Sequence, residues 1–461
     1  MNYILTADIG STFTKVTAID IQNRKILGVA RSFTTAAENV QEGFENALKE
    51  LYAQTGKLNF AEKVAASSAY GGLKMVSVGL VPNLTSKAAK MTASSAGAKV
   101  MKSFSYELSR DEILEIMAIS PDIVLLTGGI DGGNKEVILA NAKHIGEIST
   151  DFSVIVAGNK VVSTECGDII KSYGKTCIVT ENVMPEFEKL NIGPAKNAIR
   201  ELFIKKIIDA KGLDKIQEMM DSEIVPTPLA VFDAVTLLSK GTKKEKGIGD
   251  LLVFDIGGAT TDVYSCSEGM ADKANVIYKG IKEPFSKRSV EADIGMRYSL
   301  SSLVEEAGVD EVCDKSGADC EQVKAWIDIC LKNPDAVPGS GGVNQNIDKA
   351  LAALAVEICV NRHAGTIEKV YTHFGEVFAQ TGKDLSEIST VIGSGGVIIN
   401  SPDPKFILSH AGYSLNTPEI LKPKNAAPYL DKNYILTAMG LLSKKYPSEA
   451  LEITKENMFK L

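Results

Sequence analysis

The chain has 461 residues, enough for two large domains or about three average ones. Hydrophobic residues make up 44% of the chain and charged residues 23%, which excludes collagen-like, coiled-coil and disordered proteins. Asp and Glu outnumber Lys and Arg by 58 to 50, giving a net charge of -8. Because this acidic balance comes without long runs of one sign, it argues against binding to duplex nucleic acid.

Seven cysteines occur in the chain, and no two of them form a CxxC pair. An odd number without such pairs predicts neither a disulfide framework nor a four-thiolate zinc site. The first residues form a strand-like run without the basic and apolar regions of a signal peptide, and no apolar segment approaches the ~20 residues of a membrane helix. We therefore expect a soluble cytoplasmic protein that binds neither nucleic acid nor membrane.

The N-terminal region predicts three strands and an amphipathic helix, with hairpin turns at Gly10 and at Gln22-Asn23. These elements are NYILTAD (2–8), FTKVTAID (13–20), KILGVARSF (25–33) and the helix 38–54. A second hairpin is predicted in LLVFDIGGATTDVYSC (251–266), after a polar, lysine-rich stretch that looks like a linker. DIGSTFTKV (8–16) and DIGGATTDV (255–263) match at five of nine positions. This internal repeat predicts two similar lobes, each opening with a tight hairpin.

Between the two hairpins, apolar runs bounded by glycine alternate with helical stretches, a pattern typical of parallel strands. The predicted strands are 122–129, 153–158 and 176–180, and the predicted helices are 84–101, 194–210 and 228–240. The C-terminal half is mostly helical. It contains a long predicted helix at 347–380, a strand and turn at 390–398 and a closing helix at about 432–445.

The first hairpin has the composition of a phosphate cradle. Asp8 ends a strand, and Gly10 lets the backbone turn so that successive N–H groups face one point. Hydroxyl groups follow at Ser11, Thr12 and Thr14. Lys15, on the returning strand, reaches toward the same phosphates as a point charge.

The second hairpin repeats this pattern with Gly257, Gly258, Thr260, Thr261 and the trailing acid Asp262. Because carboxylates repel bare phosphate, a bridging Mg²⁺ is expected. Mg²⁺ keeps most of its waters and prefers one or two carboxylates plus phosphate oxygens. Asp8 and Asp255 are thus the candidate metal and catalytic residues, holding Mg²⁺ through water.

A third glycine-rich turn, VIGSGGVI (391–398), follows an apolar strand. Its glycines, Gly393, Gly395 and Gly396, leave flat backbone against which a nucleobase or ribose can lie. Each of the three motifs alone is also compatible with an ordinary turn, and the pairing of the hairpins favours nucleotide binding. Neither the Walker A pattern nor GxGxxG occurs in the chain, so nucleotide binding depends on the two hairpins.

The three motifs resemble, in order and rough spacing, the phosphate-one, phosphate-two and adenosine motifs of the actin, hexokinase and heat-shock chaperone ATPase superfamily. AMG (438–440) resembles the second hinge motif of that superfamily. The resemblance implies an α/β fold with two ribonuclease-H-like lobes that close on ATP and Mg²⁺, and the material between the hairpins then forms an α/β insertion in the first lobe.

A narrower resemblance covers most of the chain. It is similar to the accessory ATPases encoded beside adenosylcobalamin-dependent glutamate (methylaspartate) mutase, a family that shares its name with a mismatch-repair protein. The strings that carry it are SSAYGGLKMVSVGLVP (67–82), LLTGGIDGGN (125–134), ENVMP (181–185), NIGPAKNAIRE (191–201), RSVEADIGMR (288–297), NRHAG (361–365) and TGKDL (381–385). The resemblance implies a reactivating factor that uses ATP to open an inactivated mutase, so that damaged cobalamin leaves and intact coenzyme enters. Ala292 stands where a glycine is usual in that family.

The repeat and the resemblance together predict six segments. They are the N-terminal part of the first lobe (1–83), an inserted module for partner docking or swivelling (84–188), the helical part of the first lobe (189–240), a linker (241–249), the second lobe (250–431) and a C-terminal helix that returns to the first lobe (432–461). LTGGIDGGN is assigned to structure or docking in this scheme and not to phosphate binding.

Two acids in RSVEADIGMR are further candidates. In chaperone-type relatives an acidic loop at this place closes over the γ-phosphate, which implies that Glu291 or Asp293 orients the attacking water. The alternative is a strand-to-helix capping segment with surface ion pairs. His363 is predicted to be a hydrogen-bonded structural residue of the long helix.

Cobalamin is expected to belong to the partner, since none of the four histidines has Asp two residues before it, as a base-off cobalamin ligand requires. Other functions remain open for this fold. A small-molecule kinase acting on a sugar or carboxylic acid needs an acceptor pocket, and no dedicated string for one is evident. A cytoskeletal ATPase predicts a basic amphipathic tail, and an activator of an iron–sulfur dehydratase predicts paired surface cysteines.

Overall fold

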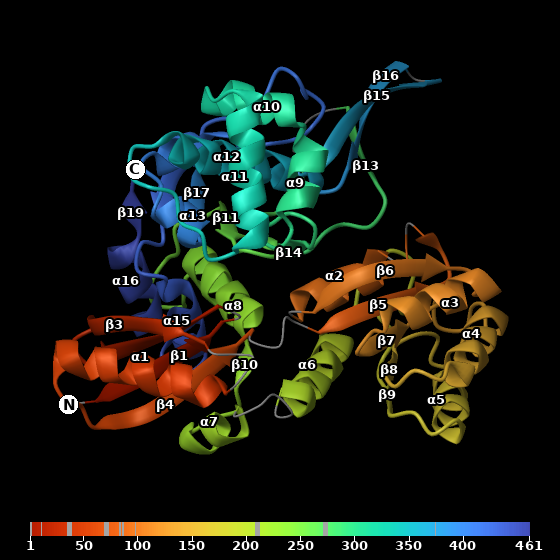
Figure 1. The fold of residues 1–461 in the computed structure, drawn as a ribbon. Helices are drawn as coiled ribbons and strands as arrows, with labels where there is room; N and C mark the ends of the chain where they lie inside the picture. The colour runs from red at the N-terminus through yellow and green to blue at the C-terminus, as the bar shows by residue number, and fades with distance from the viewer. Residues whose placement is uncertain are drawn as a thin grey trace. The chain divides into compact units, whose positions relative to one another are not determined.

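The computed structural model describes residues 2–10, 12–34, 39–68, 73–82, 84, 87–96, 98–207, 213–270, 275–373 and 375–461. Within these residues the strands form four sheets and the chain between them forms helices, so the protein is α/β (Figure 1). The chain divides into two compact units. Unit 1 comprises residues 1–233 and 437–445, and unit 2 comprises residues 234–436 and 446–461.

The first sheet of unit 1 has the order β3-β2-β1-β4-β10. Its elements, with the helices around it, are β1 (Tyr3–Ile9), β2 (Phe13–Asp20), β3 (Lys25–Phe33), α1 (Val40–Thr55), β4 (Phe60–Ser67), α7 (Leu213–Met219) and β10 (Val225–Pro226). β1, β2 and β3 are antiparallel neighbours, whereas β4 pairs with β1 in parallel. The buried residues of α1 recur every three or four positions, so one face of the helix is apolar.

Between β4 and β10 the chain builds a second sheet of unit 1, in which all strands are parallel. Its elements are β5 (Lys74–Gly79), α2 (Lys87–Ser95), β6 (Lys99–Ser105), α3 (Arg110–Ile119), β7 (Ile123–Leu126), α4 (Glu136–Glu147), β8 (Ser153–Val156), α5 (Ser163–Ser172), β9 (Cys177–Val179) and α6 (Gly193–Ile207). The strand order is β6-β5-β7-β8-β9, which is a doubly wound arrangement. The expected α/β insertion in the first lobe is therefore present.

Two details of this insertion differ from the sequence-based prediction. β5 pairs with β6 and β7, so the boundary expected between residues 83 and 84 falls inside the insertion and not before it. The helix expected over 84–101 is α2, which ends at Ser95, and residues 99–101 already belong to β6. Both the boundary of the insertion and the end of α2 are set by strand pairing across the sheet, which local sequence propensity does not predict.

The main sheet of unit 2 has the order β14-β12-β11-β17-β18-β19. Its strands are β11 (Leu251–Ile256), β12 (Thr261–Cys266), β14 (Ser286–Glu291), β17 (Thr390–Ser394), β18 (Ala427–Leu430) and β19 (Phe459–Lys460). As in unit 1, three antiparallel neighbours are followed by a strand parallel to the first of them. The same pairing scheme in both units confirms the expected pair of ribonuclease-H-like lobes.

The helices of unit 2 lie between the strands of this sheet along the chain, and unit 2 also contains a smaller sheet of order β13-β16-β15 (Figure 1). They are α9 (Leu300–Ala307), α10 (Val309–Ser316), α11 (Cys320–Lys332), α12 (Val343–His363), α13 (Gly396–Ile399), α14 (Pro404–Ser409) and α16 (Pro447–Asn457). The strands of the smaller sheet are β13 (Val276–Lys279), β15 (Thr366–Thr372) and β16 (Gly375–Thr381).

The helix expected over 347–380 was too long, because α12 ends at His363. The chain turns at Gly365, whose N–H donates to Lys383 O, and a Cβ at this position would lie 2.6 Å from the backbone of Gly382. β-branched and aromatic residues then fill β15, as strands favour.

Two helices run from one unit into the other along the chain, α8 (Thr227–Lys240) and α15 (Ile435–Leu442). The boundary between the units therefore falls within α8 and not in the expected linker. Residues 241–249 form a tight turn in unit 2. Gly241 forms an isolated β-bridge with Lys246, and the N–H of Ile248 donates to Leu238 O. Within the described residues, no helix is both long and apolar enough to span a membrane.

Candidate functional site

The first hairpin, β1 to β2, places Asp8 directly opposite Lys15. Directly opposed residues of an antiparallel pair lie on the same face, so the carboxylate and the ammonium group are neighbours on the sheet. The turn is closed by Gly10 N–H, which donates to Phe13 O at 3.0 Å. A Cβ on Gly10 would lie 2.7 Å from that oxygen, so only glycine permits the turn. Ser11 lies outside the described residues.

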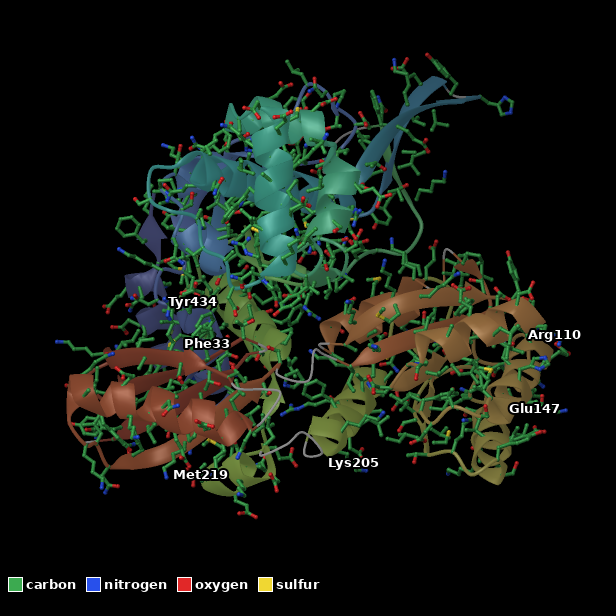
Figure 2. All side chains as sticks on the ribbon, viewed as in Figure 1. Phe33, Arg110, Glu147, Lys205, Met219 and Tyr434 are labelled. Carbon is green, nitrogen blue, oxygen red and sulfur yellow. The ribbon has the colours of Figure 1, made fainter. Side chains whose placement is uncertain are left out.

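Hydrogen bonds tie Thr12, through its backbone, and Thr14, through its hydroxyl, to the end of β3. Thr34 N–H donates to Thr12 O at 2.9 Å, which ties the turn to the end of β3. The buried Thr14 and Thr34 hydroxyls are 3.1 Å apart and share a hydrogen bond. At the end of β3, Phe33 stacks on Phe13 and is 56% exposed (Figure 2).

Two threonines that the sequence did not single out hold Asp8. Thr227, the first residue of α8, donates to Asp8 Oδ1 at 2.7 Å. Thr437, in α15, donates to Asp8 Oδ2 at 3.4 Å. Thr437 immediately precedes the AMG string, which was the only signal near it, whereas nothing in the local sequence marks Thr227. Each oxygen of the carboxylate thus has its own hydroxyl donor.

The second hairpin, β11 to β12, repeats the turn of the first. Asp255 lies opposite Asp262, and Gly257 N–H donates to Thr260 O at 2.9 Å. A Cβ on Gly257 would lie 3.0 Å from Thr260 O, which is closer than nearly all real contacts of this kind. Gly258 has more room, because its Cβ would lie 3.5 Å from the Tyr298 ring.

A loop of residues 292–299, here called the clamp loop, holds the carbonyl groups of this turn. Met296 N–H donates to Gly257 O at 3.1 Å, and the N–H groups of Arg297 and Tyr298 both donate to Gly258 O at 2.8 Å. Two further hydrogen bonds complete the clamp, from Ser299 Oγ to Ala259 O at 2.6 Å and from Thr261 Oγ1 to Ile294 O at 3.0 Å.

The clamp loop fixes where the amide groups of the turn point. In a trans peptide the C=O and the following N–H point in opposite directions. Since the carbonyls of residues 257–259 face the clamp loop, the N–H groups of Gly258, Ala259 and Thr260 face away from it. No hydrogen bond to these three N–H groups occurs within the described part of the chain. Such a row of N–H groups is a site for an anion.

Asp262 is not available as a free acid on this hairpin. Arg288 of β14 donates from Nε to Asp262 Oδ1 at 2.8 Å, and its Nη2 lies 2.6 Å from the same oxygen. Burial disfavours the charge of Arg288, but the neighbouring Asp262 carboxylate outweighs this effect and raises the pKa of the guanidinium. The pair is almost fully buried, so Asp262 is neutralised in place.

Glu291 and Asp293 both form ion pairs with Arg362 near the end of α12. Arg362 Nη1 lies 3.2 Å from Glu291 Oε2 and donates to both oxygens of Asp293 at 2.9 Å. These contacts agree with the alternative of a structural ion-paired segment, and a catalytic role for either acid stays a prediction.

The third motif lies beside the second hairpin, because β17 pairs in parallel with β11 and places Ser394 opposite Asp255. Gly395 has φ +93°, and a Cβ on it would overlap the backbone of Ile256. Gly393 is also tightly packed, with its Cβ position 2.8 Å from the Ile398 side chain. Gly396 has ordinary space, so close packing requires two of these three glycines.

His363 has the structural role expected for it. It is fully buried, with Nε2 2.8 Å from Ser265 Oγ and Nδ1 2.7 Å from Ser289 Oγ. Burial, with a smaller effect of the nearby Lys287 and Lys383, lowers the pKa of His363 well below its ordinary value. The neutral imidazole therefore joins α12 to β12 and β14.

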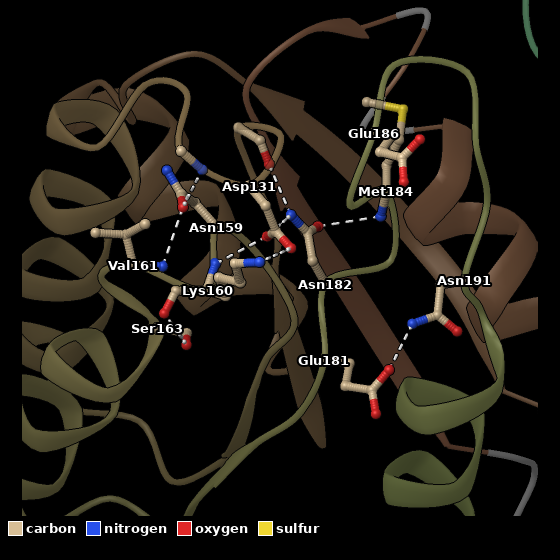
Figure 3. Close-up of polar contacts among 12 residues, drawn as sticks. Asp131, Asn159, Lys160, Val161, Ser163, Glu181, Asn182, Met184, Glu186 and Asn191 are labelled. Atoms are coloured by element: carbon tan, nitrogen blue, oxygen red, sulfur yellow. Dashed lines mark hydrogen bonds and ion pairs between the residues drawn. The ribbon is translucent and has the colours of Figure 1, made fainter.

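In the insertion, the glycine-rich loop 127–134 is fixed by two asparagines at the carboxyl edge of the sheet (Figure 3). Asn159, which follows β8, bonds to three backbone atoms of the loop. Asn182, which follows β9, donates to Gly129 O and to Asp131 Oδ1, both at 3.0 Å. Their side-chain amides thus tie the loop to the segments that follow β8 and β9.

The described residues thus assemble two partial sites. Unit 1 carries Asp8, Lys15 and the first turn, and unit 2 carries Asp255, the clamped second turn and the third motif. Within the part of the chain that the structure describes, no three His, Cys, Asp or Glu side chains form a cluster able to hold a metal ion.

Comparison with known proteins identifies relatives along the whole chain. The model of a family described as MutL protein matches residues 4–458. Protein MutL from Clostridium tetanomorphum is 43% identical over 470 residues, covering 100% of both chains.

Solved structures show only weak likeness. Ethanolamine utilization protein EutJ from Carboxydothermus hydrogenoformans is 12% identical with a TM-score of 0.29, over 98% of this chain and 90% of that one. Xylulose kinase from Lactobacillus acidophilus is 8% identical with a TM-score of 0.35, over 100% and 93%. A glycerol dehydratase reactivase is 10% identical with a TM-score of 0.33, over 95% and 99%. TM-scores this low add nothing to the strand topology described above.

Proposed function

The chain belongs to the family described as MutL protein, and we propose on that basis that it is a MgATP-dependent reactivating factor for an adenosylcobalamin-dependent glutamate mutase. In this role, ATP binding and hydrolysis change the conformation of the bound mutase, so that damaged cobalamin leaves and intact coenzyme enters. The choice of mutase rests on the long strings of the chain that resemble accessory ATPases of that enzyme.

The observation that best supports nucleotide binding is the row of N–H groups at residues 258–260, which have no hydrogen-bond partner among the described residues. The clamp loop orients these groups before any ligand arrives, so a phosphate gains their hydrogen bonds without reordering the turn. The Cβ positions of Gly10 and Gly257 are blocked by backbone oxygens, which keeps both turns short enough for close approach of an anion. The residues therefore fit the phosphate end of a nucleotide.

Asp8 and Asp255 occupy the same position at the ends of their strands, and we assign them to Mg²⁺ through its water ligands. MgATP supplies the phosphoanhydride bond whose hydrolysis drives the conformational cycle. Lys15 offsets phosphate charge beside Asp8, whereas Arg288 neutralises Asp262 on the second hairpin. Gly393, Gly395 and Gly396 are assigned to the adenosine.

We assign the attacking water to Glu291 or Asp293. Because Arg362 binds both carboxylates, the acid that orients water is itself held in position by the guanidinium. The assignment predicts that replacing the working acid by its amide lowers the rate of hydrolysis and leaves nucleotide affinity nearly unchanged.

The insertion is assigned to docking or swivelling of the partner. The two lobes contain all the residues assigned above to the nucleotide, so this doubly wound sheet is free for another task. Its carboxyl edge, fixed by Asn159 and Asn182, suits a surface that must transmit movement without deforming. Surface changes there are expected to impair mutase binding and reactivation more than ATP hydrolysis.

We further propose that cobalamin stays with the mutase and that the protein acts in the cytoplasm. His363 is buried with both ring nitrogens bonded to serines, so it is closed to a cobalt ion. No histidine of the chain lies in the D-x-H pattern of base-off cobalamin ligation.

The proposal is tested by incubating the purified protein with cyanocobalamin-blocked glutamate mutase, adenosylcobalamin and MgATP. Recovery of mutase activity is expected with the wild-type protein and not with the Asp255→Ala variant or with MgADP alone. A mutase that stays blocked, although the protein binds nucleotide, would rule out this partner. Recovery without any nucleotide would rule out the dependence on ATP.

A further inference from the structure

Asp8 connects the first hairpin to both helices that run between the units. Its two oxygens accept hydrogen bonds from Thr227 in α8 and Thr437 in α15. These donors are 219 and 429 residues from Asp8 in the sequence, so the tertiary fold brings them to one carboxylate.

Each donor lies close to the unit boundary of its helix. Thr227 begins α8, and the boundary follows Asp233 within the same helix. Thr437 is the first residue of unit 1 in α15, directly after the boundary at Leu436. A helix transmits displacement along its axis, because its backbone hydrogen bonds make it stiff. Movement at either hydroxyl is therefore passed along a helix into unit 2.

The two helices also contact each other inside unit 1. A Cβ on Gly440 of α15 would overlap the carbonyl oxygen of Ala230 in α8. The backbones therefore touch where only glycine fits, one turn or less beyond the two threonines. This contact couples the helices, so the Asp8 carboxylate bonds to a packed pair and not to two independent segments.

We propose that Thr227 and Thr437 are positioning residues that report the state of Asp8 to α8 and α15 and so set the relative movement of the two units. The proposal rests on the assignment of Mg²⁺ and nucleotide to Asp8 for its trigger, but the connection itself is a property of the chain. A carboxylate that shifts toward a bound cation moves or loses its hydroxyl partners, and the two helices follow.

The test measures the distance between the units by fluorescence energy transfer. Fluorophores are carried on unnatural amino acids at the exposed positions Lys49 of α1 and Lys324 of α11. The variants are Thr227→Val and Thr437→Val, because valine keeps the branched shape and removes the donor. Thr227→Ser restores the hydroxyl. Thr236→Val, in the same helix, is the matched control, since its hydroxyl bonds to Ser286 and not to Asp8.

Without nucleotide, we expect Asp8→Ala and Thr227→Val to change the distance distribution in the same direction. Because both remove the same hydrogen bond, the double variant changes it no more than Asp8→Ala alone. Additive changes, or no change in either single variant, would overturn the proposal. This comparison needs no ligand, so its result stands even if the protein binds no nucleotide.

With MgADP, the shift of the distance distribution is expected to fall by about half or more in Thr227→Val, because one of two charge-assisted donors is gone. It recovers in Thr227→Ser and is unchanged in Thr236→Val. Calorimetry on the same samples separates the two proposals. Failure of the wild-type protein to bind MgADP contradicts the proposed function, whereas normal binding with a full shift in both valine variants contradicts the role of the threonines.

Discussion

The two hairpins of the internal repeat share a turn and differ in charge. In both, a glycine N–H closes the turn onto the carbonyl three residues later, and an aspartate ends the first strand. Opposite that aspartate the first hairpin has Lys15 and the second has Asp262. The two hairpins therefore share the closure of the turn and differ in the side chain opposite the aspartate.

The second hairpin compensates for its extra acid from a third strand. Arg288 of β14 is buried against Asp262, so the pair adds no net charge to that face. In the first hairpin, Lys15 occupies the position that corresponds to Asp262, and Arg31 lies opposite Lys15 on β3. One lobe thus carries a cation opposite its aspartate, whereas the other pairs its cation with Asp262 and has backbone N–H groups that face away from the clamp loop.

The largest effect is expected from the position at which the two hairpins agree. Asp8→Ala and Asp255→Ala should each abolish ATP hydrolysis and leave the fold intact, because both carboxylates are assigned to the metal. Steady-state hydrolysis assays, with circular dichroism for the fold, measure this. Asp328→Ala, an exposed acid on α11, is the control and should hydrolyse ATP normally. Wild-type turnover in either site variant would show that the hairpins are not equivalent halves of one site.

The second-largest effect is expected opposite the aspartate of the shared turn, where the first hairpin has Lys15 and the second has Asp262. Lys15→Ala should weaken MgADP binding by about 1.5–3 kcal/mol, because a charge-assisted contact to phosphate is lost. Isothermal titration calorimetry measures the dissociation constant, with the exposed Lys25→Ala of β3 as control. An unchanged dissociation constant would mean that the cation opposite Asp8 serves the sheet and not the ligand.

A smaller effect is expected from the clamp loop of the second hairpin. A Cβ on Gly295 would lie 2.5 Å from the backbone of Ala259, so Gly295→Ala forces the clamp loop away from the turn. We expect the free energy of unfolding of unit 2 to fall by about 1–3 kcal/mol, as for other overpacked sites. Denaturant unfolding followed by tryptophan fluorescence reports this, since Trp326 lies in unit 2.

Gly258→Ala is the matched control for that experiment. Its Cβ would lie 3.5 Å from the Tyr298 ring, which is ordinary contact. Stability should therefore stay within about 0.5 kcal/mol of the wild-type value. If both alanine variants are equally stable, the clamp loop adapts and does not hold the turn.

Much of the fold followed from local pattern. The repeat DIG…T.V predicted both hairpins, and glycine-bounded apolar runs predicted the strands of the insertion. The end of α12 was missed because helical periodicity before Gly365 was extended through a β-branched segment, which the pairing of β15 with β16 makes a strand. Pairing between strands that are distant in the sequence cannot be predicted from a short stretch of residues.

The site was less predictable than the fold. Thr227 and Thr437 meet Asp8 through tertiary structure alone, so no spacing in the sequence indicates them. The sequence could also have excluded one ion-pair partner of Glu291. Arg288 and Glu291 are three residues apart in one strand and so lie on opposite faces, which excludes a pair between them.

The smallest expected effect is a loss of folding stability at acidic pH, which we attribute to His363 in unit 2. Burial lowers the pKa of His363 well below its unfolded value of about 6.5, so below that pH the unfolded chain binds a proton that the folded protein does not. The contribution of His363 to stability is therefore present above about pH 6.5 and is lost as pH falls, by at most about 1.4 kcal/mol per pH unit. Burial lowers the pKa of Lys383 to about 8, so Lys383 changes its protonation mainly above neutral pH.

Denaturant unfolding of the wild-type protein between about pH 7 and about pH 5.5 should show this loss, a window above the ordinary range of carboxylates. In His363→Gln the amide keeps hydrogen-bonding capacity toward Ser265 and Ser289 but does not titrate, so the variant should be less stable at neutral pH and should lose this slope. An unchanged slope in the variant would mean that the acid sensitivity belongs to another group. If the dependence of stability on pH disappears in the variant, the acid sensitivity belongs to His363, where α12 contacts β12 and β14. This is the unit whose hairpin contains the buried pair of Arg288 and Asp262.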